Sequence, residues 1–172
     1  MSKEAQFWEL VAAAKNAEDQ ESAFWANDPP DVVDPPDLLT QALAAVVRFV
    51  ERHPDHRDTF VRCFIELALW QQPAPWDLVP FCMRQLRFPE VQAAIHSDAD
   101  AHWNPITEAR FEHRTLRCEP GSASTESHTL ESWLAEKQIV ATDEDYCEAR
   151  YYADHMNYWS AINAAYVEET AQ

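Results

Sequence analysis

Glycine is almost missing from this chain. Gly121 is the single glycine among 172 residues, whereas average usage is about 7%. Phosphate-cradling loops, dinucleotide-binding turns and the strained turn that carries a nucleophilic serine all need glycines, because the backbone must approach a ligand closely or adopt unusual angles. These three kinds of site are therefore excluded. Tight two-residue hairpins also favour glycine, so the composition favours helices joined by proline-marked loops over a sheet-rich fold.

Long apolar runs and closely spaced cysteines are missing as well. No stretch approaches the roughly eighteen apolar residues that a membrane-spanning helix needs. The start, MSKEAQFWEL, carries Glu4 and Glu9 where a secretory signal would have a basic end and an apolar run. The cysteines, Cys63, Cys82, Cys118 and Cys147, form no CxxC pair. Scattered thiols of this kind suit a reducing compartment, so we expect a cytoplasmic protein without a membrane segment.

Basic residues are scarce. Thirteen Lys and Arg stand against thirty Asp and Glu, for a formal net charge of −17 and a sequence pI near 4.6. This balance argues against binding nucleic acid or an anionic membrane through a basic patch. The segment 16–37 holds no Lys or Arg, and its acidic residues are Glu18, Asp19, Glu21, Asp28, Asp31, Asp34 and Asp37. Such acidity can serve solubility alone, or it can steer a basic protein partner.

The chain has ample material for a core, since 47% of its residues are hydrophobic and 12% are aromatic. Its length is typical of one domain. Apolar residues recur at helical spacing, which predicts helices near the start and over 36–53, 58–70, 76–88, 89–97, 128–138 and 143–169. We predict that the side chains buried on the best-defined faces are Leu39, Leu43, Val46, Phe49, Phe60, Phe64, Ile65 and Trp159.

These patterns predict an all-α protein, a single helical domain over 1–172 folded as an irregular bundle. An acidic, proline-rich loop is expected at 26–37 and a long C-terminal helix at 143–169, with Thr142 as its cap. The segment 98–128 has no sustained period and is expected to be irregular. Its one short run that could form a strand is ARFEHRTLRC, residues 109–118.

Two consecutive helix pairs separated by proline breaks occupy 37–97. This pattern resembles the stacked hairpins of HEAT and armadillo repeats, although no internal repeat of fixed period is present. The resemblance covers about a third of the chain and carries no functional residues. An irregular bundle is the favoured alternative, and neither architecture specifies a function.

The stretch AIHSDADAHWNP places His96, Asp98, Asp100 and His102 at every second position. In an extended segment these side chains would point to one side and could bind zinc, manganese or iron. A calcium loop of the EF-hand type is excluded, because the required glycine and the acid at the twelfth position are absent. If the preceding helix instead continues through residue 100, the side chains diverge around it. The favoured interpretation is this helix end, with acidic residues that cap and solvate it.

Two further groups of polar residues are candidate sites. In HPDHRD, His53, His56 and Asp58 lie close together in a turn between helices, and Asp58 is expected to cap the second helix. On the final helix, Glu144, Glu148, Tyr151 and His155 fall on one stripe. The stripe lacks the Glu-x-x-His pairing of di-iron bundles, because Tyr152 lies three residues before His155. A solvated acidic face is therefore the simpler interpretation.

Taken together, these features favour a non-enzymatic interaction protein that binds a basic protein, for example as an inhibitor or immunity protein that masks a cationic surface. The expected contact residues are Asp31, Asp34, Glu144, Glu148 and Tyr151. No catalytic residue and no cofactor are predicted. The alternative is a metal-dependent enzyme that uses the cluster His96, Asp98, Asp100 and His102.

Overall fold

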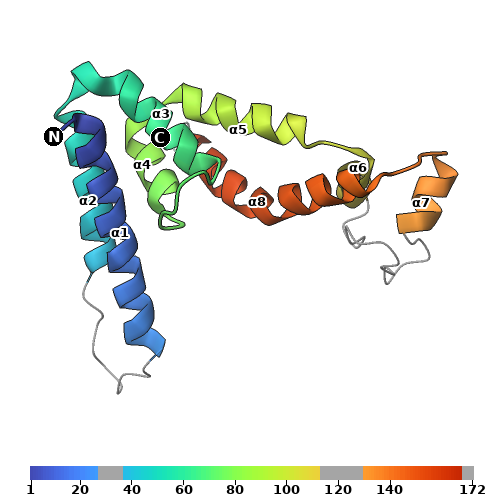
Figure 1. Cartoon of the computed structure of the whole chain (residues 1–172), viewed down its shortest axis with the longest axis horizontal. Coiled ribbons are helices and arrows are strands. Elements are labelled where there is room, and N and C mark those ends of the chain that lie inside the picture. Colours follow the sequence, from blue (N-terminus) through green and yellow to red (C-terminus); the bar gives the residue numbers. More distant parts are fainter. Residues whose placement is uncertain (27–36, 113–129, 168–172) are drawn as a thin grey trace. The chain divides into compact units, whose positions relative to one another are not determined.

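The computed structural model describes residues 1–26, 37–112 and 130–167, and within these ranges every regular element is a helix (Figure 1). The elements are α1 (Lys3–Ala26), α2 (Leu38–Glu51), the short 3-10 helix η1 (Pro54–His56), α3 (Arg57–Ala68), α4 (Leu78–Leu86), α5 (Pro89–Ala101), α6 (Pro105–Glu112), α7 (Leu130–Glu136) and α8 (Asp143–Val167). The predicted all-α architecture is confirmed. No helix among the described residues has the length and apolar character needed to cross a bilayer.

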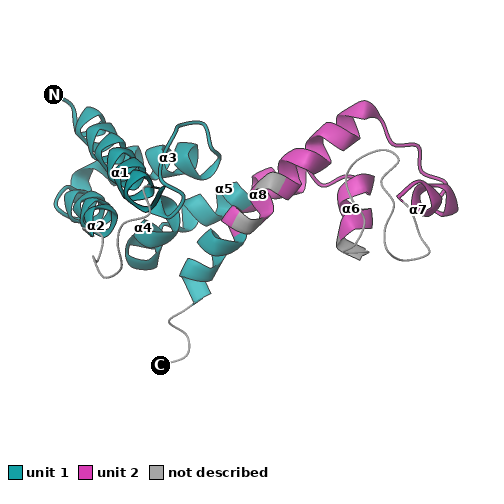
Figure 2. Cartoon of the chain, turned by 90° about the horizontal axis from the view of Figure 1, so that it is seen from below, with its two compact units in different colours: residues 1–95, 160–172 teal, residues 96–159 magenta. Residues whose placement is uncertain are grey.

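The chain divides into two compact units, which are described separately here (Figure 2). Unit 1 comprises Met1–Ile95 and Ser160–Gln172, and unit 2 comprises His96–Trp159. The predicted single domain over 1–172 stays a prediction. Most of the expected loop at 26–37 and the second half of the segment 98–128 lie outside the described residues, as do Asp31 and Asp34.

In unit 1, α1 and α2 lie side by side along most of their lengths (Figures 1 and 2). The carboxylate of Glu21 in α1 accepts a hydrogen bond of 2.8 Å from the backbone N–H of Leu39 in the first turn of α2. This contact satisfies one of the N–H groups that have no partner within the helix. The main neighbour of α2 is α1, whereas the short turn HPDH at 53–56 predicted that α2 would pair with α3. The resemblance to HEAT hairpins extends no further than helices joined by short loops.

An aromatic cluster forms the core of unit 1. The ring centroid of Phe7 in α1 lies 5.7 Å from that of Phe60 and 5.2 Å from that of Phe64, both in α3. Phe64 in turn packs at 6.0 Å against Phe88, which lies just before α5. Phe7, Phe60 and Phe64 are completely buried, and pairs of this geometry add stabilisation beyond the burial of apolar area. The apolar stripe read from the sequence of α3 therefore does face the core.

A second, smaller core holds unit 2 together. Its buried members are Ile106, Ala109, Leu130, Trp133, Leu134 and Ala149, contributed by α6, α7 and α8. Ile139, Ala141, Tyr146 and Ala153 pack against it as partly buried neighbours. The apolar faces of α6 and α7 therefore pack against each other, and α8 adds Ala149 to the same core.

Two corrections concern helices and caps. Residues 98–101 belong to α5 and residues 105–112 to α6, so the first part of the predicted irregular segment is helical, and so are the first four residues of the possible strand at 109–118. The remaining residues of that run lie outside the described part. Asp58 lies inside α3 with its side chain fully exposed, and His56 occupies the N-cap position without a side-chain hydrogen bond. A stronger start signal was present in Asn104-Pro105, because asparagine caps helices well and proline suits the first helical position.

The burial predictions hold in part. Leu43, Val46, Phe60, Phe64 and Trp159 are buried, whereas Leu39, Phe49 and Ile65 are only half-buried. On α8, Tyr158 is 3% exposed, whereas Met156, two residues earlier, is 38% exposed. Helical spacing identifies a face, but the neighbours in space decide how much of that face is covered.

Candidate functional site

The four residues of the metal hypothesis do not converge. Because α5 continues to Ala101, successive side chains point in different directions around the helix. His102, just beyond the helix, places its Nδ1 at 2.7 Å from the backbone oxygen of Asp98 and at 3.8 Å from the carboxylate Oδ2 of the same residue. His96 and Asp100 are exposed. In the described part of the chain, no three His, Cys, Asp or Glu side chains are grouped closely enough to hold a metal ion.

The turn HPDHRD, in unit 1, is explained by local contacts. The Nδ1 atom of His53 lies 2.8 Å from the backbone oxygen of Phe49, one turn earlier in α2. The Nε2 atom of His56 lies 3.3 Å from the carboxylate of the adjacent Asp55. These contacts belong to a helix end and a surface turn, and Asp58 points into solvent instead of toward either histidine.

On α8, exposure to solvent decreases along the predicted stripe from Glu144 to His155. Glu144 is exposed, Glu148 and Tyr151 are half-buried, and His155 is 8% exposed. The stripe therefore begins in solvent and ends inside unit 2. Of the predicted contact residues that the structure describes, Glu144, Glu148 and Tyr151 lie on this one stripe.

Tyr151 lies in a stack of rings. Its centroid is 4.5 Å from that of His102 and 4.1 Å from that of His155, with interplanar angles of 32° and 28°. Its hydroxyl donates a hydrogen bond of 3.3 Å to the Oδ2 atom of Asp98. Burial and, to a lesser degree, the Asp98 carboxylate raise the pKa of Tyr151. The ring is therefore held in one orientation, as a neutral phenol at physiological pH.

His155 connects this stack to the interior. Its Nδ1 atom lies 2.7 Å from the backbone oxygen of Tyr151, and its ring lies 5.6 Å from that of Trp159. Asp98 and His102 on one side and His155 on the other thus form a support for Tyr151. The sequence placed Glu144, Glu148 and Tyr151 on one stripe, but it gave no sign that the His96–His102 stretch would supply this support.

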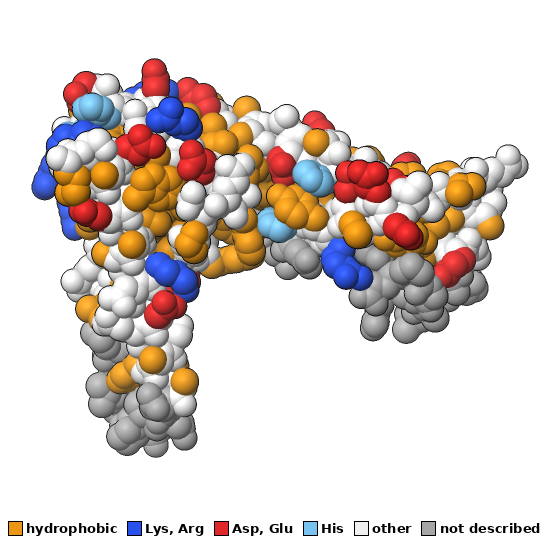
Figure 3. Space-filling view, in the orientation of Figure 1, with side chains coloured by type: hydrophobic (Ala, Val, Ile, Leu, Met, Phe, Trp, Pro, Cys, Tyr) orange, Lys and Arg blue, Asp and Glu red, His pale blue; other side chains and the backbone are white. Residues whose placement is uncertain are grey.

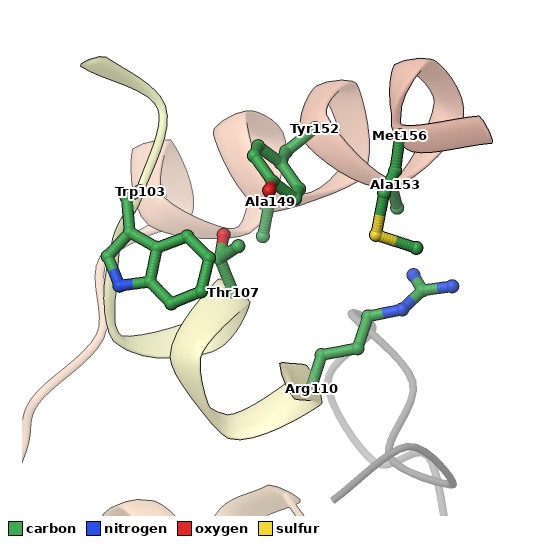
Figure 4. Close-up of a pocket in the computed structure, with 7 residues that line it drawn as sticks. All are labelled: Trp103, Thr107, Arg110, Ala149, Tyr152, Ala153 and Met156. Atoms are coloured by element: carbon green, nitrogen blue, oxygen red, sulfur yellow. The ribbon is translucent and has the colours of Figure 1, made fainter. Parts of the chain in front are cut away.

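The side of α8 next to the stripe borders a pocket in unit 2, which the sequence did not indicate (Figure 4). The described residues that line it are Trp103, Thr107, Arg110, Ala149, Tyr152, Ala153 and Met156. Its volume is about 380 Å³, within the range of small-molecule sites. The rings of Trp103 and Tyr152 meet edge to face at 5.8 Å.

Asn104 fixes the position of Trp103 and of α6. Its Oδ1 atom accepts hydrogen bonds of 3.0 Å from the backbone N–H groups of Ile106 and Thr107. Its Nδ2 atom donates to the backbone oxygen of Asp145 at 2.9 Å. Asn104 is 8% exposed, so this buried amide satisfies both its acceptor and one donor while it joins α6 to the first turn of α8.

The cap predicted for α8 is present. The hydroxyl of Thr142 accepts a hydrogen bond of 3.2 Å from the backbone N–H of Asp145, and the Asp145 carboxylate accepts one of 2.6 Å from the backbone N–H of Thr142. This reciprocal pattern is a capping box with aspartate in the third position. Asp145 thus has a structural role in the cap, in which the side chains of Thr142 and Asp145 take part.

Acidic side chains outnumber basic ones among the described residues of unit 2. One face of the molecule is shown in Figure 3. The acidic side chains described are Asp98, Asp100, Glu108, Glu131, Glu136, Asp143, Glu144, Asp145 and Glu148, against the basic Arg110, Lys137 and Arg150. The excess of carboxylates gives this unit a negative field.

Comparison with known proteins adds no identification. No protein-family model matches the chain, no curated protein sequence matches it, and no solved structure matches its fold. Any function must therefore be inferred from the residues themselves.

Proposed function

We propose that this chain is an acidic, all-helical protein–protein interaction module that binds a basic protein. The contact surface is the α8 stripe, defined as Glu144, Glu148 and Tyr151. The observation that carries the proposal is the support of Tyr151, which is stacked between His102 and His155 and hydrogen-bonded to Asp98 beside two accessible carboxylates. An aromatic side chain held in place loses little conformational entropy when a partner covers it.

Charge supports the class of partner. The formal net charge of −17 attracts cationic surfaces over a range of about 8 Å at physiological ionic strength. Glu144 and Glu148 lie four residues apart on one helix face, so a partner that presents Lys or Arg at matching spacing can contact both. The same field repels nucleic acid and anionic membranes, so neither is included in the proposal.

A finer form of the proposal makes the chain an inhibitor or immunity protein that masks a cationic active site or nucleic-acid-binding surface of its partner. We place it in the cytoplasm, because Cys63, Cys82 and Cys147 are free thiols and a reducing compartment keeps thiols free. The alternative of a metal-dependent enzyme has less support, since no three of His96, Asp98, Asp100 and His102 are grouped closely enough to hold a metal ion.

The test begins with capture of partners from the native host at low salt, followed by kinetics with the purified partner. We expect association to slow steeply as salt is raised, because steering between exposed charges is screened. The variant Glu144→Lys/Glu148→Lys should slow association about tenfold or more at low salt. The variant Tyr151→Ala should mainly speed dissociation, whereas Tyr151→Phe, which keeps the ring, should bind nearly as well as the wild type.

The matched control is Glu9→Lys/Glu51→Lys, which changes the net charge equally at two exposed positions of unit 1. A much smaller effect of this control locates the contact on α8. Equal slowing by both double variants would contradict a contact at the α8 stripe. It would mean that only the net charge of the chain affects association. A flat salt response would contradict electrostatic steering altogether. If the finer form is correct, the partner must also lose its enzymatic or nucleic-acid-binding activity in the complex.

A further inference from the structure

The pocket of unit 2 has no part in the proposed contact with a basic protein. Its wall on α8 is formed by Ala149, Tyr152, Ala153 and Met156, and the two alanines leave the space that larger side chains would fill. The opposing wall is formed by Thr107 and Arg110 of α6 and by Trp103, which lies before α6 (Figure 4).

The apolar lining is partly accessible to solvent. Trp103 is 42% exposed and Met156 is 38% exposed, although both are large hydrophobic side chains. With the edge of Tyr152 against Trp103, the pocket offers ring faces and a polarisable thioether, which bind aromatic groups well. A flat aromatic ligand can therefore remove apolar surface from water on both walls.

Among the described residues that line the pocket, none is acidic and the one with a formal charge is Arg110, which is basic in a chain with a net charge of −17. In Figure 4, the Arg110 side chain extends away from Trp103, toward the side of the pocket on which Met156 lies. A guanidinium has five N–H donors, so it can bind a ligand carboxylate even while it contacts another group of the protein.

We propose that this pocket binds a small aromatic carboxylate, with its ring against Trp103 and Tyr152 and its carboxylate on Arg110. Arginine suits this task because its planar fork matches the two oxygens of a carboxylate. The ligand should carry one negative charge only. The pKa of Tyr152 is raised mainly by burial and, to a lesser degree, by the negative charge of Asp100. The Asp100 carboxylate would therefore repel a second anionic group of the ligand.

The test uses isothermal titration calorimetry on the full chain with 2-naphthoate, and with the neutral, similarly shaped 2-naphthamide. We expect 2-naphthoate to bind at one site with a dissociation constant of about 10 to 1000 μM, as suits a ligand of this size. The naphthamide should bind about tenfold more weakly, because it forms no charge-assisted hydrogen bond with Arg110.

Two variants and one control locate the site. Arg110→Gln should weaken naphthoate about tenfold and leave naphthamide almost unchanged. Met156→Glu, at a position that is 38% exposed and therefore tolerant of a charge, should weaken naphthoate far more than naphthamide by repelling its carboxylate. Arg150→Gln removes a charge from an exposed position of the same helix and should change neither affinity. Circular dichroism confirms that each variant remains folded.

Three outcomes would overturn the proposal. The first is no heat of binding with 2-naphthoate up to about 1 mM. The second is equal affinity for the acid and the amide, which would leave an unselective apolar pocket. The third is an Arg150→Gln variant that loses as much naphthoate affinity as Arg110→Gln, which would mean that general charge, not the pocket, holds the ligand. None of these results bears on the contact with a basic protein, because that contact uses another face of α8.

Discussion

The side-chain amide of Asn104 donates a hydrogen bond of 2.9 Å to the backbone oxygen of Asp145, while its oxygen caps α6. One buried residue thus joins two helices of unit 2. We predict that Asn104→Ala lowers the free energy of unfolding of this unit by about 2 to 4 kcal/mol, since it removes a cap and leaves buried backbone groups without partners.

Asn104→Asp provides the matched control. Aspartate keeps the capping oxygen but cannot donate to Asp145 at neutral pH, so the loss of stability should be intermediate. Urea unfolding followed by circular dichroism measures both variants. Wild-type stability in Asn104→Ala would contradict the buried link between α6 and α8.

Tyr166 predicts how stability responds to alkaline pH. Its hydroxyl donates to the backbone oxygen of Phe88 at 2.7 Å, and burial, with a smaller contribution from Glu90, raises the pKa of Tyr166 to about 12. In the unfolded chain the same phenol loses its proton near pH 10. Between these values the folded state holds more protons than the unfolded state, so the stabilisation is complete below about pH 10 and is lost progressively toward pH 12.

The variant Tyr166→Phe tests this dependence. It should be less stable than the wild type at neutral pH, because the bond to Phe88 is lost, yet its stability should fall less between about pH 9 and pH 11. Urea unfolding at both pH values gives the change in the free energy of unfolding with pH for the variant and for the wild type. Burial also raises the pKa of Cys63 to about 12, so Cys63 adds to the pH dependence of both proteins. The prediction therefore concerns the difference in pH dependence between the variant and the wild type. An identical pH dependence would show that Tyr166 is not buried as described.

The thiols should differ sharply in reactivity. Burial raises the pKa of Cys63 to about 12 and that of Cys82 further still, whereas Cys147 is exposed. Because the thiolate is the reactive form, a Cys118→Ser variant should present one fast-reacting thiol to Ellman's reagent, and two more only after denaturant is added. Fast reaction of all three thiols in the folded protein would contradict the burial of Cys63 and Cys82.

The metal hypothesis also leads to a measurable expectation. No three of His96, Asp98, Asp100 and His102 are grouped closely enough to hold a metal ion, so zinc should not bind there with one-to-one stoichiometry after dialysis. Elemental analysis should give the same zinc content for wild type and for His96→Ala/His102→Ala. This variant should be somewhat less stable, since His102 stacks on Tyr151. Tightly bound zinc that is lost in the variant would restore the alternative of a metal-dependent enzyme.

Much of the local structure follows from the sequence. The near absence of glycine and the three-and-four spacing of apolar residues predict an all-helical chain, and α8 begins at Asp143 after the cap residue Thr142 as expected. Hydrophobic spacing and capping chemistry act within a few residues of each other, so they can be read without knowledge of distant neighbours. Glu144, Glu148 and Tyr151 could be assigned to one stripe for the same reason.

Only the tertiary structure decided which faces meet and which residues share a site. Glu21 caps α2 from eighteen residues away, and Tyr158 is buried while Met156 remains accessible. Of the alternating His and Asp residues, Asp98 and His102 contact Tyr151. The pocket between Trp103 and Met156 exists because α6 and α8 are held together by Asn104 and packed over Ala149. Such contacts join residues that are far apart in the chain, and their free energies depend on packing that no local pattern encodes.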